Sequence, residues 1–373
     1  MPTRNQLLEL VATAANFPTA ERRGQPPGRG FRATLRVMDL STVSDNEAVF
    51  HDGARTIRQV GLQTESFYEI HGHEFVTLPA RGELLATIAT VNDVHFGEQR
   101  CGYIEGSGGG PVLSSLPGMD PYPEVMNAGV VAEIGALAPD AVVVKGDLTA
   151  DGTEEQYRRF CEVYSGFEDR LHHVRGNHDS YGGASFAATP TQQVVLDGVI
   201  IALLDTSRAH QVNGSLDSNQ LEWLEEIAES ADRPVLVFGH HHVWNGESDP
   251  RSDSFFGIRP TDSERLLEVF GRHRRLSGYF AGHTHRNRVQ WLEVGGGSPR
   301  LVPVVEVACV KDFPGTWAEY RVFEGGITQI HRRISTPAAL RWSENCRQMY
   351  DGGYPWYAFG SLEDRCFEVC TSG

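Results

Sequence analysis

Long apolar runs are absent from this chain, and their absence excludes one broad class of proteins. A membrane-spanning helix needs about 20 consecutive apolar residues, and no stretch of the 373 residues approaches that length. The N-terminal stretch MPTRNQLLELVATAANF contains a short apolar piece, but Glu9 interrupts it and it is too brief for a signal peptide. The sequence therefore predicts a cytoplasmic protein that does not enter a membrane.

Positive charge is also scarce. The chain has 33 Lys and Arg residues against 49 Asp and Glu residues, which gives a formal net charge of -16 at pH 7. Such a balance repels a polyanion unless metal ions or a local basic patch reverse the field. The composition therefore argues against long nucleic acids as partners and leaves small ligands as the expected ones.

Cysteine is too sparse and too scattered for a disulfide scaffold, because a chain of this length has only six. We therefore expect reduced thiols. Cys346, Cys366 and Cys370 lie close together near the C-terminus, but a structural zinc site would require a fourth ligand. Two interpretations of this group stay open, namely buried thiols or one disulfide.

The composition along the chain predicts four parts. Residues 1–30 end in a Pro-, Gly- and Arg-rich stretch, which predicts a flexible segment. Residues 31–85 alternate short apolar and polar pieces between turns, as is typical of a small β-rich unit. Residues 86–335 form the main domain. Residues 336–373 are an aromatic tail, and since exposed aromatic surface is unfavourable we expect it to pack on the domain or on a partner subunit of a homo-oligomer.

The main domain alternates between predicted strands and helices, which indicates an α/β fold. Short β-branched runs between turn residues predict buried strands at 84–91, 141–146, 171–176, 194–207, 234–240 and 275–282. Amphipathic segments with plausible caps predict helices at 124–138, 153–167, 218–229 and 262–273. A further strand is expected at 300–310, and a hairpin that turns at Gly325-Gly326 is expected over 317–335.

Side chains that bind metals follow five of these strands. Because the carboxyl ends of parallel strands meet at one edge of a sheet, we expect these side chains to share a single crevice. Glycine precedes four of the five groups and allows the backbone to turn sharply there. The groups are, in chain order, Asp93 and His95; Asp147; Asn177, His178 and Asp179; His240; and His283 and His285.

Together the five segments resemble the motifs of the calcineurin-like metallophosphoesterase superfamily, over roughly residues 86 to 300. The resemblance implies a four-layer α/β/β/α sandwich with two metal ions in its catalytic domain, which we place at residues 86–335. It implies one ion held by Asp93, His95 and His285, and a second held by Asn177, His240 and His283. It also implies that Asp147 bridges both ions. Mixed imidazole and carboxylate ligands suit manganese, iron, zinc or cobalt better than calcium or magnesium.

The chemistry of such a site is hydrolysis of a phosphate ester. Two divalent ions about 3.5 to 4 Å apart lower the pKa of a shared water and hold the attacking and leaving oxygens of a phosphoryl group. This predicts in-line attack by a metal-bridging hydroxide. His178, next to Asn177, is expected to stabilise the transition-state charge or to protonate the leaving alkoxide, and Asp179 to orient it. A structural role beside the metal ligands is the alternative for His178.

Two differences from the sequences of sister branches narrow the range of expected substrates. Asp147 is followed by Leu-Thr-Ala-Asp-Gly, without the arginine of the protein Ser/Thr phosphatases, and Ala150 stands where purple acid phosphatases carry a tyrosine. The segments GDLTADGTEEQYRRF and GNHDS most resemble bacterial class III cyclic-nucleotide and glycerophosphodiester phosphodiesterases. We therefore predict hydrolysis of small phosphodiesters, cyclic nucleotides first. The alternatives are a phosphomonoesterase for nucleotides or small metabolites and, from another class, a non-catalytic metal-binding scaffold.

Residues near the site suggest where a substrate would lie. His241 and His242 directly follow His240, and they either reach a phosphate oxygen of the substrate or are solvated neighbours of a ligand. The long segments 101–123 and 242–260 are expected at the rim of the site. The second carries an arginine and several aromatic residues, which would stack a base and pair with a phosphate, or else form a packed surface loop.

Overall fold

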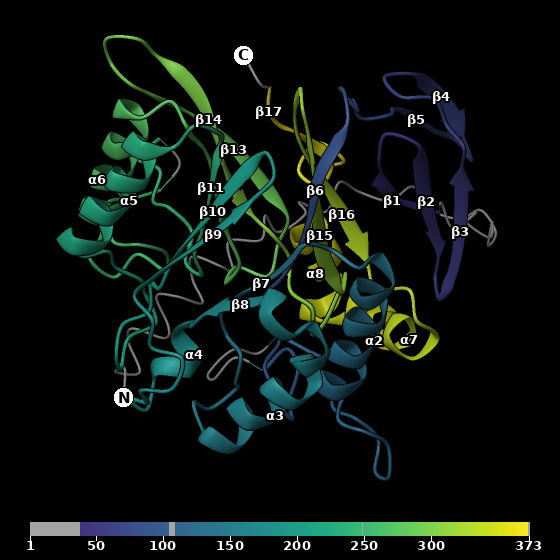
Figure 1. Cartoon of the computed structure of the whole chain (residues 1–373). Coiled ribbons are helices and arrows are strands. Elements are labelled where there is room, and N and C mark those ends of the chain that lie inside the picture. Colours follow the sequence, from purple (N-terminus) through teal and green to yellow (C-terminus); the bar gives the residue numbers. More distant parts are fainter. Residues whose placement is uncertain (1–37, 104–108, 248, 372–373) are drawn as a thin grey trace, which may run out of the picture.

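Two six-stranded sheets face each other in the computed structural model, which describes residues 38–103, 109–247 and 249–371 (Figure 1). The first sheet has the order β17 (Phe367–Thr371), β16 (Gly326–Arg333), β15 (Thr316–Phe323), β6 (Leu84–Val91), β7 (Ala141–Lys145) and β8 (Leu171–Val174). The second has the order β13 (Arg288–Val294), β14 (Arg300–Glu306), β12 (Leu276–Ala281), β11 (Val235–Phe238), β10 (Val199–Leu204) and β9 (Thr191–Leu196).

Apolar side chains from the inner faces of both sheets form the central layer of the core. Phe280 of the second sheet stacks on Phe238 with ring centroids 5.2 Å apart and meets the ring of Tyr320 from the first sheet edge-on at 5.1 Å. Ile88 and Leu203 are fully buried in the same cluster. Because each sheet hides one face against the other, both need helices on their outer faces.

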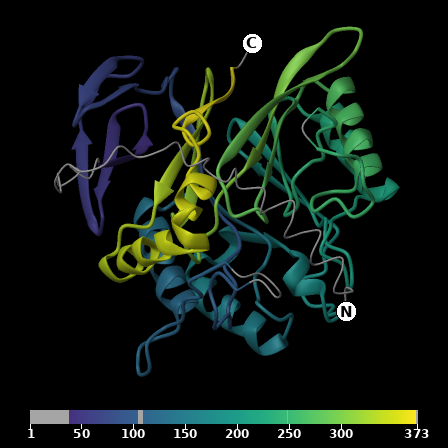
Figure 2. The same ribbon diagram turned by 180° about the vertical axis from the view of Figure 1, so that it is seen from behind.

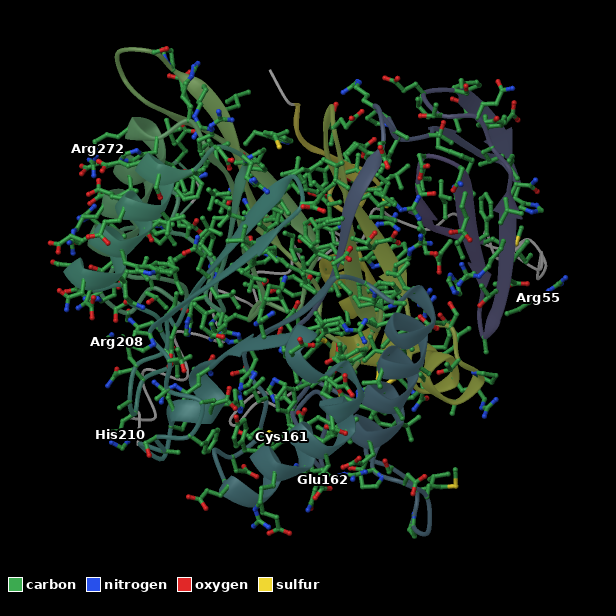
Figure 3. The ribbon with its side chains drawn as sticks, in the orientation of Figure 1. Arg55, Cys161, Glu162, Arg208, His210 and Arg272 are labelled. Carbon is green, nitrogen blue, oxygen red and sulfur yellow. The ribbon has the colours of Figure 1, made fainter. Side chains whose placement is uncertain are left out.

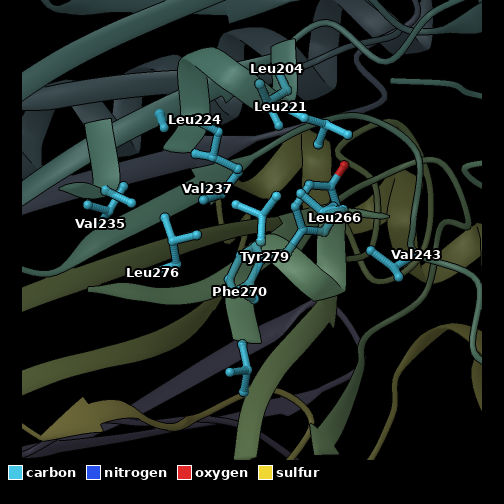
Figure 4. Close-up of a cluster of buried hydrophobic side chains, with 14 of the residues drawn as sticks. Leu204, Leu221, Leu224, Val235, Val237, Val243, Leu266, Phe270, Leu276 and Tyr279 are labelled. Atoms are coloured by element: carbon cyan, nitrogen blue, oxygen red, sulfur yellow. The ribbon is translucent and has the colours of Figure 1, made fainter. Parts of the chain in front are cut away.

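The helices supply these outer layers. The second sheet is covered by α5 (Ser218–Ser230) and α6 (Pro260–Arg272), whose Leu221, Leu224 and Phe270 pack with Tyr279 (Figure 4). The first sheet is covered by α2 (Tyr122–Leu137), α3 (Glu154–Tyr164) and α7 (Pro337–Asn345). Figure 3 shows Arg272 of α6 at the upper left, well separated from Cys161 and Glu162 of α3 at the bottom. This arrangement confirms the predicted four-layer α/β/β/α sandwich.

Local sequence explains where these helices begin. The side chain of Asp217 accepts a hydrogen bond from the backbone of Gln220, and the side chain of Gln220 bonds back to the Asp217 backbone, so that α5 starts in a capping box. Thr153 accepts a bond from the backbone of Gln156 at the start of α3, which continues into the 3-10 turn η1 (Ser165–Arg170).

The prediction of one strand over 194–207 is wrong, because the segment belongs to a hairpin. β9 and β10 pair antiparallel around Asp197-Gly198, and Gly198 has a φ of 76°. An Asp-Gly pair between apolar residues is a strong hairpin signal. β13, which was not predicted, is an edge strand that pairs with β14. The hairpin over 317–335 is confirmed, but Phe323 pairs with Gly326, so that Glu324 and Gly325 form its turn.

A small β-rich unit precedes the sandwich, as predicted. It consists of β1 (Asp39–Val43), β2 (Glu47–Asp52), β3 (Arg55–Val60) and the hairpin of β4 (Phe67–Ile70) and β5 (His73–Val76). The unit packs beside β16: the Thr42 hydroxyl donates to the His331 carbonyl at 2.7 Å, and the His331 ring donates to the Ser41 carbonyl at 2.9 Å. The segment 1–30, predicted to be flexible, lies outside the described residues.

His51 makes this unit sensitive to acid. Its ring is buried between the hydroxyl groups of Ser41 and Ser335, at 2.9 and 3.1 Å. Burial, with the positive charge of Arg333, lowers the pKa of His51 from 6.5 to about 3. Between those two pH values the unfolded chain binds the proton and the folded chain does not, so stability falls as pH falls.

Lowering the pH from 7 to 5 should therefore reduce the free energy of unfolding by about 2 kcal/mol through His51 alone. The measurement is the urea midpoint at both pH values for wild type and for His51→Gln, which does not titrate. The variant should lose less stability than wild type. Equal losses would contradict the buried neutral state of His51.

The C-terminal segment packs on the sandwich (Figure 2, yellow). Trp342 of α7 stacks on Tyr122 with centroids 4.4 Å apart, and its Nε1 donates to the Lys311 carbonyl at 2.9 Å. After the short turns η2 (Cys346–Gln348) and η3 (Tyr350–Gly352) come α8 (Tyr354–Ala358) and β17. All six cysteines are free thiols, which leaves the first of the two interpretations of the C-terminal group. Within the described ranges, no helix is both long and apolar enough to span a bilayer.

Candidate metal centre

The seven side chains predicted to bind metals lie just beyond the carboxyl ends of five strands. β6, β7 and β8 run parallel in the first sheet, and β11 and β12 run parallel in the second. The loops after them carry, in the same order, Asp93 and His95; Asp147; Asn177, at the start of α4 (Asn177–Ser180); His240; and His283 and His285. All except His285 are largely buried, and the side chain of His285 is 22% exposed. The two sheets thus bring the predicted ligands to a common edge.

One group of ligand atoms comes from both sheets. Asp93, His95 and His285 each offer an atom within 4.8 Å of the others. His285 Nε2 lies 3.5 Å from Asp93 Oδ1, and the backbone N–H of His283 donates to the same carboxylate at 3.0 Å. Three of the predicted ligands therefore converge at this point.

Asp147 lies between this group and a second one. Its Oδ2 is 3.4 Å from His95 Nε2, and its Oδ1 is 3.4 Å from His240 Nε2. His240 Nε2 also lies 3.1 Å from the amide oxygen of Asn177, while His240 Nδ1 donates to the Lys145 carbonyl at 2.8 Å. The two oxygens of one carboxylate thus face histidines on opposite sides.

The backbone around the site is held in a conformation that L-residues rarely adopt. Left-handed conformations cost about 1–2 kcal/mol for each non-glycine residue, and they persist at functional sites where the surrounding structure enforces them. Gly176 passes so close to Asp147 that a Cβ there would collide with the carboxylate. Five of the seven predicted ligands have positive φ: Asp93 (54°), His95 (47°), Asp147 (50°), His283 (69°) and His285 (56°).

Neighbouring carboxylate and imidazole groups in the site shift one another's pKa values. Burial alone would raise the pKa of Asp147, but His240 and His178 hold it well below the usual range. Burial lowers the pKa of His240, but Asp147 outweighs this effect and raises the pKa to about 9. Burial, with the nearby His240, holds the pKa of His283 well below its usual value. The carboxylates are thus ionised, and bound cations would take the place of histidine protons.

The donor set fits transition-metal ions, and His95 provides a test. Its ring is buried, yet neither nitrogen has a hydrogen-bond partner among the described residues. A buried ring without partners is unfavourable, whereas a ring nitrogen directed at a cation is satisfied. The other donors are imidazole nitrogens, carboxylate oxygens and one amide oxygen, which favours manganese, iron, zinc or cobalt.

His178 and Asp179 lie at the site but do not form the expected pair. The Nδ1 of His178 donates to the carbonyl of Ala150 at 2.7 Å, and its ring stands 4.5 Å from the ring of His95. Asp179 instead accepts from the backbone of Thr149 at 2.8 Å and of Gly176 at 2.8 Å. Burial, with the charge of Asp147, raises the pKa of Asp179 to about 6. Asp179 therefore braces the loop that carries Asp147, and a backbone carbonyl orients His178.

His241 and His242 are both buried beside the site. Both nitrogens of His241 are occupied, by the Thr206 hydroxyl at 2.8 Å and by the Val212 carbonyl at 3.0 Å. His242 is buried against Phe255 at 5.1 Å, and its Nδ1 has no hydrogen-bond partner within the described part of the chain. Contact of either ring with a substrate stays a prediction, and for His241 it would require the loss of one of these bonds.

The segment 242–260 reaches the site through its backbone and one ring. Phe256 stacks on His283 at 3.9 Å, and its carbonyl accepts from His283 Nε2 at 2.8 Å. Arg251 forms an ion pair with Glu264 and lies over the ring of Trp244. These groups are thus engaged with protein partners. Of the segment 101–123, residues 104–108 lie outside the described residues.

Sequence reasoning missed Tyr181. Its hydroxyl accepts a hydrogen bond from Asn177 Nδ2 at 2.5 Å, and its ring lies 4.9 Å from that of His178. The bond uses the amide nitrogen of Asn177 and leaves the amide oxygen facing His240. The spacing of four residues between Asn177 and Tyr181 is the signal that could have identified this contact, because one helical turn brings such residues together.

Comparison with known proteins identifies the family. A sequence model described as calcineurin-like phosphoesterase matches residues 86–287, more than half of the chain, and this range includes all seven predicted ligands. The chain belongs to the calcineurin-like phosphoesterase family. Phosphoesterases of this family use a dinuclear metal centre, and this phosphoesterase is a phosphoric ester hydrolase.

The phosphoesterase resembles proteins that act on diesters. It is 28% identical over 219 residues to the glycerophosphodiester phosphodiesterase GpdQ of Enterobacter lignolyticus, which covers 53% of this chain and 70% of that protein. It is 28% identical over 160 residues to the 3′,5′-cyclic adenosine monophosphate phosphodiesterase CpdA of Haemophilus influenzae, which covers 39% and 55%. Among solved structures, a dimetal phosphatase from Danio rerio matches with a TM-score of 0.48 at 17% identity, covering 68% of this chain and 98% of that one.

Proposed function

We propose that this phosphoesterase hydrolyses small phosphodiesters, cyclic nucleotides first among them, at a pair of transition-metal ions. The observation that carries the proposal is the position of Asp147. Its two carboxylate oxygens lie 3.4 Å from His95 on one side and 3.4 Å from His240 on the other. A carboxylate between two sets of imidazole and carboxylate donors is suited to bridge two cations.

The ligands divide between the two ions as follows. Asp93, His95 and His285 would hold the first ion, and the mutual proximity of their ligand atoms supports this group. Asn177, His240 and His283 would hold the second ion. The contact between Asn177 and His240 supports this second group, as does the 5.0 Å separation between the rings of His240 and His283. Manganese, iron, zinc or cobalt fits these donors.

When bound, two such ions lower the pKa of a water molecule and neutralise charge on the phosphoryl oxygens. A side chain of the protein would then supply the proton to the leaving group. Because Nδ1 of His178 carries the hydrogen that is donated to Ala150, its Nε2 is the nitrogen free to act on a substrate. In the protonated ring, Nε2 would donate a proton to the leaving oxygen of the ester.

Two features support a diester as the substrate. The relatives named above are phosphodiesterases, one for glycerophosphodiesters and one for cyclic adenosine monophosphate. The loop after Asp147 has no arginine before Arg158. Such an arginine would offer a bidentate site for the extra charge of a monoester. A diester, with one charge fewer on its phosphoryl group, needs no such partner.

Comparison of a diester with a monoester tests this proposal. Protein loaded with manganese should hydrolyse bis(p-nitrophenyl) phosphate with a kcat/KM at least about tenfold above that for p-nitrophenyl phosphate, a difference of 1.36 kcal/mol in transition-state stabilisation. Chelated protein should turn over neither compound. 3′,5′-cyclic adenosine monophosphate would be assayed next.

The opposite preference would replace this proposal. Faster hydrolysis of the monoester would indicate a phosphomonoesterase that acts on nucleotides or other small metabolites. Absence of metal-dependent turnover of both compounds would contradict the proposed reaction altogether.

A further inference from the structure

Behind the proposed first metal site, His285 faces a buried carboxylate and His95 faces a partly buried one. The Nδ1 of His285 lies 3.7 Å from Asp312 Oδ2, on the edge of the ring away from Asp93. The Nδ1 of His95 lies 3.8 Å from Glu98 Oε2 in the same way. Both distances are about 1 Å longer than a charge-assisted hydrogen bond, so that a small rotation of either ring would form one.

Lys311 joins these two carboxylates. Its ammonium group lies 2.9 Å from Glu98 and 3.4 Å from Asp312. Lys311 and Asp312 are buried in the loop between β14 and β15. Glu98 lies much earlier in the sequence, in the segment between β6 and α2. The ammonium group of Lys311 thus pairs with both carboxylates, the one that faces His95 and the one that faces His285.

The C-terminal tail anchors this bridge. The hydroxyl of Tyr354, at the start of α8, donates to Asp312 Oδ1 at 2.7 Å, and the Cys309 thiol lies 2.8 Å from the same oxygen. The next turn of the tail holds the loop that bears His285: Tyr357 donates to the Thr284 carbonyl at 2.9 Å. α8 lies outside the segment that the family model matches. The contact therefore involves residues beyond the segment matched by the family model.

A further metal ion in this place is a poor alternative. His285, Cys309 and Asp312 do come within 4.8 Å of one another. However, the ammonium group of Lys311 lies 3.4 Å from Asp312 and would repel a cation there. Asp312 already accepts from Tyr354 and Cys309, so its charge is compensated inside the protein.

We propose that Asp312, Glu98, Lys311 and Tyr354 are positioning residues, which hold the rings of His285 and His95 for the first metal ion. The proposal rests on the proposed metal site. A carboxylate that accepts the second N–H of a metal-binding histidine fixes its tautomer and orientation, and its loss weakens metal affinity by about 10- to 100-fold. Only the first ion should be affected, because His240 of the second site has a different partner, the Lys145 carbonyl.

Calorimetric titration of chelated protein with manganese tests this inference. Asp312→Asn should bind one ion about 10- to 100-fold more weakly and keep the wild-type affinity for the other. Tyr354→Phe removes a single oxygen and should weaken the same ion by a smaller factor. In the double variant Tyr354→Phe should add little, because Tyr354 acts through Asp312. Tyr350→Phe is the matched control, since its hydroxyl makes no hydrogen bond to a described residue.

The outcomes separate the two proposals. If wild type binds two ions and both Asp312→Asn and Tyr354→Phe bind them with wild-type affinity, the positioning role is overturned and the proposed metal site stands. Equal weakening of both ions, or weakening matched by Tyr350→Phe, would overturn it as well, since either result would indicate a general structural effect. Wild type that binds no manganese would overturn both proposals. The thermal midpoint of the chelated variants shows whether they are folded.

Discussion

Asp147→Asn should reduce turnover of bis(p-nitrophenyl) phosphate to that of the chelated wild type, a loss of at least about 1,000-fold. The asparagine keeps the shape of the side chain but loses its negative charge and one of its two acceptor oxygens. In the structure one oxygen faces His95 and the other faces His240, so that no single-oxygen side chain can serve both sides. Metal content, measured by mass spectrometry after dialysis, should fall together with activity.

Asp151→Asn is the matched control for this variant. Asp151 lies four residues further along the same loop, but it is exposed and bonds to Gln156 at 2.9 Å. It should keep wild-type metal content and turnover. Retention of two ions and of activity within about tenfold by Asp147→Asn would contradict the bridging role.

His178→Ala should lower kcat for a cyclic nucleotide by about 10²- to 10⁴-fold, the range expected for the loss of a general acid. It should leave metal content unchanged, because His178 is not one of the seven proposed ligands. The effect should depend on the leaving group. A nitrophenolate leaves readily without a proton, whereas the alkoxide of a cyclic nucleotide requires one, so that the loss should be greater with the cyclic nucleotide.

His178→Gln distinguishes proton donation from a structural role. Glutamine can still donate a hydrogen bond toward the Ala150 carbonyl, but it cannot transfer a proton at neutral pH. If His178 only supports the loop, the glutamine variant should regain wild-type kcat. If His178 stabilises charge without donating a proton, the losses with the two substrates should be equal. Either result would contradict the proposed general acid.

The prediction placed Asp179 at the site, but its predicted partner, His178, is wrong. The segment Gly-Asn-His-Asp places the carboxylate beside His178 in sequence, and a catalytic histidine is often oriented by a carboxylate. In the fold, residues 177–180 form one helical turn, and Asp179 points back to the backbone of Thr149 and Gly176. The direction of a side chain within a turn depends on φ and ψ, which the residue types alone do not specify.

The sequence by itself determined the alternation of strands and helices and the set of candidate ligands, whereas the two-sheet sandwich was implied by the resemblance to the family. Short buried strands are readable from β-branched apolar runs, and the ends of parallel strands share one edge, so that the polar residues after them must lie close together. For this reason Asp93 and Asp147, which follow neighbouring parallel strands of the first sheet, could be placed at one site from local pattern alone, whereas His285 reaches that site from the second sheet.

Only the tertiary structure decided which atoms face one another. The contact of Tyr354 with Asp312 joins residues 42 positions apart, and that of Lys311 with Glu98 joins residues 213 apart. No periodic pattern connects such positions, since they meet through the packing of a tail and a loop on the finished sandwich. The same holds for the two oxygens of Asp147, whose directions depend on a left-handed backbone that the surrounding fold enforces.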